Sequence, residues 1–217
     1  MTRATNKKEF RNALLQWWMI NKRDFPWRTT KDVYETLIAE IFLHRTRAEQ
    51  VVPVYNSFIK KFPDIKSIAQ AEENDVKQML RSLGLRWRAN LLILMAKELM
   101  SKYGGRIPAD KSDLESLPGI SQYIASAVRS FALELPDPIL DTNTVRILGR
   151  VFGVPVSDGS RRSEKFRKIY ESLIDIDHPR DFNFAMIDLA AKLCKPINPS
   201  CDLCPVRTMC EYKKTSS

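Results

Sequence analysis

Apolar residues recur at helical spacing along most of the chain and predict a protein made of helices. Within residues 7–20, Phe10, Leu14, Trp17 and Trp18 fall on one helix face. The same spacing predicts helices over 33–46, 47–61, 74–83, 88–103, 112–117 and 121–134, and another that starts near residue 141. Because no segment alternates with a period of two, the sequence predicts an all-α fold.

A few residues mark where the predicted helices begin and end. Gly104 and Gly105 stop one helix, and Ser112 is expected to cap the next. Pro136 and Pro138 interrupt the chain after the helix predicted to end at residue 134. These prolines are candidates for a boundary between two lobes.

Composition and charge favour a soluble protein with an acidic partner. The 217 residues carry 35 Lys and Arg against 26 Asp and Glu, a net charge of +9, and 44% of them are hydrophobic. Nucleic acid is the commonest partner of so basic a protein, although a basic surface without such a partner has the same composition. No apolar run suggests a signal peptide or a membrane span, so we expect a cytoplasmic, nucleoid-associated protein.

All four cysteines lie in one short segment. Cys194, Cys201, Cys204 and Cys210 have the spacing C-x6-C-x2-C-x5-C, and three prolines stiffen the segment between them. In a reducing compartment such a cluster predicts metal binding rather than disulfides. Four thiolates suit either a tetrahedral zinc ion or a cubane iron–sulfur cluster. A single C-x-x-C pair is unlike the paired knuckles of a zinc ribbon.

A proline–glycine turn separates two predicted helices at Leu117-Pro118-Gly119-Ile120-Ser121. A tight turn there leaves backbone N–H groups at the start of the next helix available to bind a phosphate. Most Pro-Gly turns have no such function, so the turn alone is weak evidence.

Asp141 stands at the start of the helix expected to run to Gly153. An aspartate at that position is predicted to be the N-cap. Such caps are common and purely structural in most proteins, so catalysis by Asp141 needs support from elsewhere in the sequence.

Several motifs in order resemble one family. The segment LPGIS, then LDTNTVRILGR, then the cysteine spacing resemble the helix-hairpin-helix/Gly-Pro-Asp superfamily of base-excision glycosylases, as do 25–28 (FPWR) and 37–40 (LIAE). The superfamily includes endonuclease III, MutY-type adenine glycosylases and Mig-type thymine-mismatch glycosylases.

The resemblance implies an architecture as well as an activity. We expect a helical barrel lobe over 29–134 that contains the helix-hairpin-helix, and a second lobe from 1–28 and 135–217 that holds a [4Fe-4S] cluster on Cys194, Cys201, Cys204 and Cys210. Double-stranded DNA with a mismatched or damaged base would bind in a cleft between the lobes, with the target base flipped out. We expect a monomer.

Three residues match catalytic positions of the family. Asp141 matches the aspartate that stabilises the positive charge on the sugar and orients water or acts as nucleophile. Tyr123 occupies the position where the endonuclease III group has a Schiff-base lysine, which implies a monofunctional enzyme. Glu40 matches a glutamate that contacts the flipped pyrimidine in Mig-type enzymes or protonates adenine in MutY-type ones; the alternative is a helix-surface glutamate.

Other residues match DNA-binding positions. Gly119 and Ser121 belong to the hairpin, where Ser121 replaces the usual second glycine and puts the geometry of phosphate binding in doubt. Arg45 and Arg47 lie in an arginine-rich segment typical of Mig-type enzymes, and Arg45 is a candidate to fill the gap left by the flipped base or to read the opposing guanine. Leu85 is a candidate apolar wedge between bases, with neighbouring Trp87 as a core residue in the alternative interpretation.

The leading hypothesis is a monofunctional glycosylase that removes thymine or uracil mispaired with guanine. The alternative is a MutY-like adenine glycosylase acting opposite guanine or 8-oxoguanine, although the chain lacks the C-terminal domain by which such enzymes read oxidised guanine. Removal of oxidised pyrimidines is disfavoured by Tyr123 in the lysine position. A catalytically silent DNA-binding module is disfavoured by Asp141.

Overall fold

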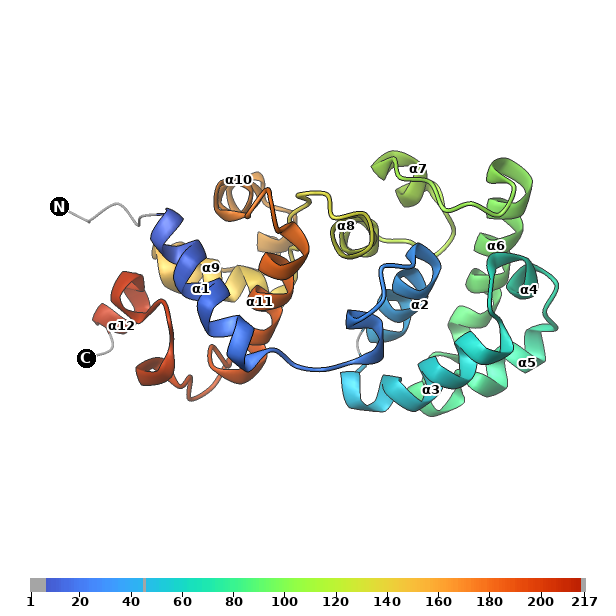
Figure 1. Ribbon diagram of the computed structural model, residues 1–217, viewed down its shortest axis with the longest axis horizontal. Coiled ribbons are helices and arrows are strands. Elements are labelled where there is room, and N and C mark those ends of the chain that lie inside the picture. Colours follow the sequence, from blue (N-terminus) through green and yellow to red (C-terminus); the bar gives the residue numbers. More distant parts are fainter. Residues whose placement is uncertain (1–6, 45, 216–217) are drawn as a thin grey trace. The chain divides into compact units, whose positions relative to one another are not determined.

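A computed structural model describes residues 7–44 and 46–215, and within these ranges the chain forms helices and no strands (Figure 1). The predicted all-α fold is therefore confirmed. The chain divides into two compact units, one of residues 24–133 and one of residues 1–23 with 134–217. We call them the hairpin unit and the cysteine unit.

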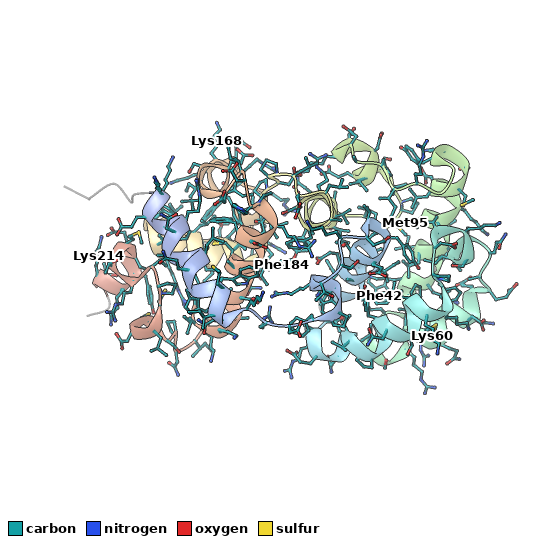
Figure 2. The ribbon with its side chains drawn as sticks, in the orientation of Figure 1. Phe42, Lys60, Met95, Lys168, Phe184 and Lys214 are labelled. Carbon is teal, nitrogen blue, oxygen red and sulfur yellow. The ribbon has the colours of Figure 1, made fainter. Side chains whose placement is uncertain are left out.

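The hairpin unit is a set of short helices around one apolar core. Helix α2 is almost entirely buried and packs against α3 and α8, while α6 packs against α4 and α5. Figure 2 marks Phe42 of α2 and Met95 of α6, both fully buried in this core, and Lys60 of α3, which is exposed. The helices are α2 (Val33–Leu43), α3 (Ala48–Lys61), α4 (Ile65–Ala69), α5 (Glu73–Met79), α6 (Ala89–Tyr103), α7 (Lys111–Ser116) and α8 (Gln122–Phe131), with single 3-10 turns η1 (Pro26–Arg28), η2 (Arg81–Leu83) and η3 (Arg86–Arg88).

The cysteine unit joins the beginning and the end of the chain. Helix α1 packs against α10 and α11, and α9 packs against α10, α11 and α12. The buried carboxylate of Asp188 in α11 accepts hydrogen bonds from the Trp18 indole at 2.9 Å and the Arg23 Nε at 2.6 Å, which fixes α1 on α11. The helices are α1 (Lys7–Asn21), α9 (Thr142–Phe152), α10 (Glu164–Leu173), α11 (Pro179–Lys192) and α12 (Glu211–Thr215), with 3-10 turns η4 (Ser160–Arg162), η5 (Cys201–Leu203) and η6 (Arg207–Met209).

Some helix boundaries differ from the prediction. The helix expected over 33–46 ends at Leu43, because His44 is extended with ψ 107°. The cap of α7 is Asp110 rather than Ser112. The Asp110 carboxylate accepts the Ser112 hydroxyl and the backbone N–H groups of Asp113 and Ser112, and these hydrogen bonds lower the pKa of Asp110. Helix α4 was not anticipated, because five residues are too few to show a period.

The predicted limits of α9 are confirmed. Asp141 is its N-cap, and Gly153 ends it in the left-handed conformation with φ 64°, which favours glycine. Among the helices that the structure describes, none combines the length and the apolar character needed to cross a membrane.

Candidate active site and cysteine pocket

The carboxylate of Asp141 is held by three hydrogen bonds at the start of α9. Its Oδ1 accepts the backbone N–H groups of Asn143 at 2.9 Å and Thr144 at 2.7 Å, and its Oδ2 accepts the Asn143 Nδ2 at 2.9 Å. In return, the Thr144 hydroxyl accepts the Asp141 N–H at 2.9 Å, which completes a capping box. The side chain therefore has one well-defined orientation.

The cap does not exhaust the bonding capacity of Asp141. A carboxylate offers about four acceptor positions, and the hydrogen bonds above use three of them. The residue is half-buried, and the positive end of the α9 dipole favours its negative charge. Asp141 can thus both cap the helix and act on a cationic group or a water molecule.

The amide of Asn143 is in turn held by Arg146, one turn further along α9. Both terminal guanidinium nitrogens of Arg146 donate to the Asn143 Oδ1 at 3.1 Å, and its Nε donates to the carbonyl oxygen of Cys194 at 2.9 Å. A chain of side-chain hydrogen bonds therefore runs from Asp141 to the first residue of the cysteine segment.

Arg150, on the same face of α9, holds the cysteine segment more directly. Its Nη1 lies 3.4 Å from the Cys194 Sγ and donates to the carbonyl oxygen of Lys195 at 2.6 Å, and its guanidinium lies 4.7 Å from the ring centroid of Tyr212. Sequence reasoning missed both arginines. Their positions, three and seven residues after Asn143, were the signal that the three side chains share a helix face.

The four cysteines line one pocket against α9 and the end of α11. Burial, together with smaller effects of the neighbouring cysteines, raises the pKa of the Cys204 thiol to about 11. Apart from cysteines, the pocket is lined mainly by apolar side chains, including Ile147, Val151 and Leu189. Within residues 7–44 and 46–215, no group of three or more His, Cys, Asp or Glu side chains has the arrangement to hold a single metal ion.

The hairpin between α7 and α8 keeps the geometry of a tight turn. Gly119 has φ 79°, and a Cβ there would lie 3.3 Å from the Cβ of Leu91, so both conformation and packing favour glycine. Ser121 has φ −90°, which any residue adopts, and its hydroxyl accepts the Ile124 N–H at 3.3 Å as the N-cap of α8. Serine in place of a second glycine therefore does not distort the turn.

Glu40 and Tyr123 lie on two helices that pack together in the hairpin unit, α2 and α8. Only 4% of Glu40 is exposed, so the alternative interpretation as a helix-surface glutamate is wrong. Carboxylates are rarely so buried without a specific role or partner. Tyr123, in the first turn of α8, packs its partly buried ring against the core. The burial of a glutamate in α2 is therefore more unusual than the partial burial of a tyrosine in α8.

Two arginines of the predicted DNA-binding set, Arg45 and Arg47, follow α2. Arg45 lies outside the described residues. Arg47 is the N-cap residue of α3, makes no side-chain capping hydrogen bond, and is exposed.

The structure does not favour the prediction that Leu85 is a wedge. A wedge needs an exposed apolar side chain, but Leu85 is 6% exposed and belongs to the core of the hairpin unit. The left-handed Gly84 and the hydrogen bond from the Leu85 N–H to the Leu80 carbonyl turn it inward. Trp87 is instead 60% exposed, with the Arg88 guanidinium 4.7 Å from its ring centroid.

Trp87 also adjoins the hairpin turn. Together with Arg88 and apolar residues of α2 and α6 it lines a pocket whose other wall is Pro118 and Gly119. The exposed aromatic ring and the candidate phosphate-binding turn therefore border one pocket of the hairpin unit.

A helical fold with a helix-hairpin-helix turn and an aspartate-capped helix after it is the architecture of a class of DNA-repair proteins. Residues 38–172 match the family model described as HhH-GPD superfamily base excision DNA repair protein. This chain belongs to that superfamily, which confirms the resemblance seen in its motifs.

Individual proteins match almost end to end. A thymine-DNA glycosylase of Aeropyrum pernix is 40% identical over 93% of both chains, and a thymine/uracil-DNA glycosylase of Methanothermobacter thermautotrophicus is 33% identical over 100% of both. The solved structure of a thermostable thymine-DNA glycosylase superposes with a TM-score of 0.90 at 32% identity, over 96% of this chain and 97% of that one.

Proposed function

We propose that this protein is a base-excision DNA glycosylase that hydrolyses the N-glycosidic bond of thymine or uracil mispaired with guanine. The observation that carries this proposal is the carboxylate of Asp141, fixed by three hydrogen bonds in a chain of the HhH-GPD superfamily. The end-to-end similarity to proteins named thymine- and thymine/uracil-DNA glycosylase supports the choice of base.

Asp141 would act on the sugar. Cleavage of the N-glycosidic bond leaves positive charge on the sugar ring, and a carboxylate beneath the ring stabilises that charge. Because the capping hydrogen bonds already orient Asp141, little reorganisation is needed when the charge develops. Its remaining acceptor capacity allows it to orient a water molecule for attack.

Tyr123 makes the enzyme monofunctional. A lysine in this position would form a Schiff base with the sugar and cut the strand, whereas a phenol has no amine to do so. The product is therefore an intact strand with an abasic site, which breaks only when alkali is added.

Glu40 would contact the flipped pyrimidine. A carboxyl group that is almost fully buried in α2 offers a hydrogen-bonding group in a site from which water is largely excluded. Such a group discriminates strongly between bases, since an incorrect base leaves it without its partner.

The DNA backbone would be held mainly by the hairpin. The start of α8, with Gly119 and Ser121 exposed in the turn before it, suits a phosphate, and the exposed Arg47 adds a positive charge. Arg45 remains the candidate for the gap left by the flipped base. Trp87 replaces Leu85 as the candidate for stacking on an unpaired base, because its ring is exposed.

We also propose that Cys194, Cys201, Cys204 and Cys210 hold a [4Fe-4S] cluster. All four line one pocket with apolar walls, which fits a group bound by thiolates. The cysteine spacing contains a single C-x-x-C pair, unlike the paired knuckles of a zinc ribbon, which favours the cluster over zinc. When bound, the cluster would fix the segment that Arg146 and Arg150 contact.

A MutY-like adenine glycosylase is the second candidate, because Glu40 and Tyr123 are compatible with it. It is less supported, since the proteins matched over nearly the full length of both chains carry thymine and uracil in their names.

The proposal is tested by base release from end-labelled duplexes that contain a guanine–thymine, guanine–uracil, guanine–adenine or 8-oxoguanine–adenine pair, each analysed with and without alkali. We expect cleavage at thymine and uracil that appears only after alkali. Release of adenine would assign the protein to the MutY-like group. Strand cleavage without alkali would contradict the role given to Tyr123.

A further inference from the structure

The segment that leads into Asp141 has no regular structure of its own. It runs from Glu134, whose φ is 53°, through Pro136 and Pro138, and it ends at the N-cap of α9. A segment with two prolines lacks two backbone donors and cannot fix itself by a helical ladder. Contacts with neighbouring residues of the cysteine unit must therefore fix the position of this segment, and with it the position of Asp141.

One such contact is made by Asn183, a fully buried residue of α11. Its Nδ2 donates to the carbonyl oxygen of Asp137 at 3.0 Å, four residues before Asp141. Its Oδ1 accepts the hydroxyl of Tyr170, a fully buried residue of α10, at 2.6 Å. Because a carbonyl can only accept, these two partners allow one orientation of the amide.

A second contact fixes the segment from the other side. The Thr144 hydroxyl donates to the carbonyl oxygen of Ile139 at 2.7 Å, while it also accepts the Asp141 N–H. The backbone is therefore held at Asp137 and again at Ile139. Together these bonds determine where α9 begins.

The buried pair also lies near the charge of Asp141. Burial raises the pKa of Tyr170 well above its usual value, and the Asp141 carboxylate raises it further. A phenol and an amide in a fully buried site are costly unless both are hydrogen-bonded, and apolar side chains of similar volume would fill the same space without that requirement. The Asn183 amide is directed at the backbone that leads into Asp141, and the Tyr170 hydroxyl is directed at that amide, which points to a role beyond packing.

We propose that Asn183, with its amide oriented by the Tyr170 hydroxyl, is a positioning residue that holds the segment 134–140 so that the Asp141 carboxylate stays beneath the sugar. This inference rests on the function proposed above for Asp141. Neither residue touches the substrate in this account, so their loss should weaken catalysis without weakening the binding of DNA.

The first test is the single-turnover rate of base release for Tyr170→Phe and Asn183→Leu. Tyr170→Phe removes one hydroxyl and little volume. It should lower the rate about tenfold, which is less than the roughly 100-fold that a misplacement of about 1 Å can cost. Tyr34→Phe is the matched control, because the Tyr34 hydroxyl is also buried and donates to a backbone carbonyl, that of Phe62, in the hairpin unit. The control should keep the wild-type rate.

The decisive readout is affinity for two duplexes, one with a cationic nitrogen analogue of the sugar and one with a neutral tetrahydrofuran abasic site. The ratio of the two affinities reports the carboxylate beneath the sugar, and a loss of packing alone would change both affinities equally. A lower ratio in Tyr170→Phe, with unchanged affinity for the neutral site, is expected. A wild-type ratio in that variant overturns the inference even if Asn183→Leu fails to fold. If the wild-type protein itself shows no preference for the cation, the role of Asp141 is wrong and the inference falls with it.

Discussion

The first turns of α8 and α9 are both capped by a side chain, but the proposed function gives them different roles. Ser121 caps α8 with a neutral, exposed hydroxyl that accepts the Ile124 N–H at 3.3 Å. Asp141 caps α9 with a half-buried carboxylate that accepts two backbone N–H groups at 2.9 and 2.7 Å. Both positions satisfy the local rule for an N-cap.

The charge of the cap makes the difference. A neutral cap leaves the positive end of the α8 dipole available to an anion such as a DNA phosphate. A carboxylate cap offsets the positive end of α9 and presents a negative charge, which suits the cation that develops on a sugar. In this account the first helix start binds DNA and the second performs the chemistry.

The largest effect is expected from Asp141→Asn. Asparagine is as good an N-cap as aspartate, so the fold should be retained, while the negative charge is lost. The single-turnover rate of thymine release should fall roughly 1,000-fold, in the range found when one stabilising group for transition-state charge is removed. The affinity for a guanine–thymine duplex should stay within about twofold, as measured by fluorescence anisotropy. Equal losses of rate and affinity would instead mark Asp141 as a structural cap.

Loss of the proposed cluster should affect α9 and spare α8. Arg146 and Arg150 tie α9 to the cysteine segment, whereas α8 belongs to the hairpin unit. Removal of iron, or Cys204→Ser, should lower base release by roughly 100-fold, as for lost supporting contacts at metal sites, and should make the segment 194–210 sensitive to protease. Iron content and the yellow-brown absorption are measured in parallel. Full activity in a colourless, iron-free protein would contradict the cluster.

Trp87→Ala tests whether the hairpin unit contributes aromatic stacking, in addition to positive charge, to the binding of DNA. Loss of one aromatic stacking contact should weaken binding to a duplex with an abasic site by about tenfold, since such contacts contribute about 1–3 kcal/mol each. The rate at saturating protein should be unchanged. Trp87→Phe, which keeps an aromatic ring, should restore most of the affinity. Unchanged affinity in Trp87→Ala would remove this residue from the interface.

The smallest effect is expected from giving α8 the cap of α9. Ser121→Asp preserves the N-cap but places a carboxylate where a phosphate is proposed to bind. Affinity for DNA should fall by about fivefold, the upper range for one charge at an exposed helix end, and the loss should shrink as salt is added. Ser101→Asp adds the same charge to the exposed surface of α6 and is the control. Equal losses in the two variants would show that only net charge matters.

Features set by residues close in sequence were predictable. The N-cap at Asp141, the left-handed Gly153 and the turn around Gly119 each follow from local backbone preferences. The spacing of the cysteines likewise placed all four in one segment, and the structure brings them to one pocket. These features depend on residues that are close in sequence, so they can be predicted without knowledge of the tertiary structure.

Features set by packing were not predictable. Leu85 was expected at the surface and Glu40 had a surface alternative, yet both are buried, because periodicity does not reveal which face a neighbouring helix covers. The Arg146 contact joins residues 48 apart in sequence, and the Tyr170–Asn183 bond joins two separate helices. Such pairs leave no signal in a single sequence.

The most direct test measures both affinity and single-turnover rate for Asp141→Asn and Ser121→Asp on one guanine–thymine duplex. The account predicts a crossed result: Asp141→Asn loses rate and keeps affinity, and Ser121→Asp loses affinity and keeps the rate at saturation. If both substitutions reduce the same quantity, the assignment of binding to α8 and chemistry to α9 is wrong.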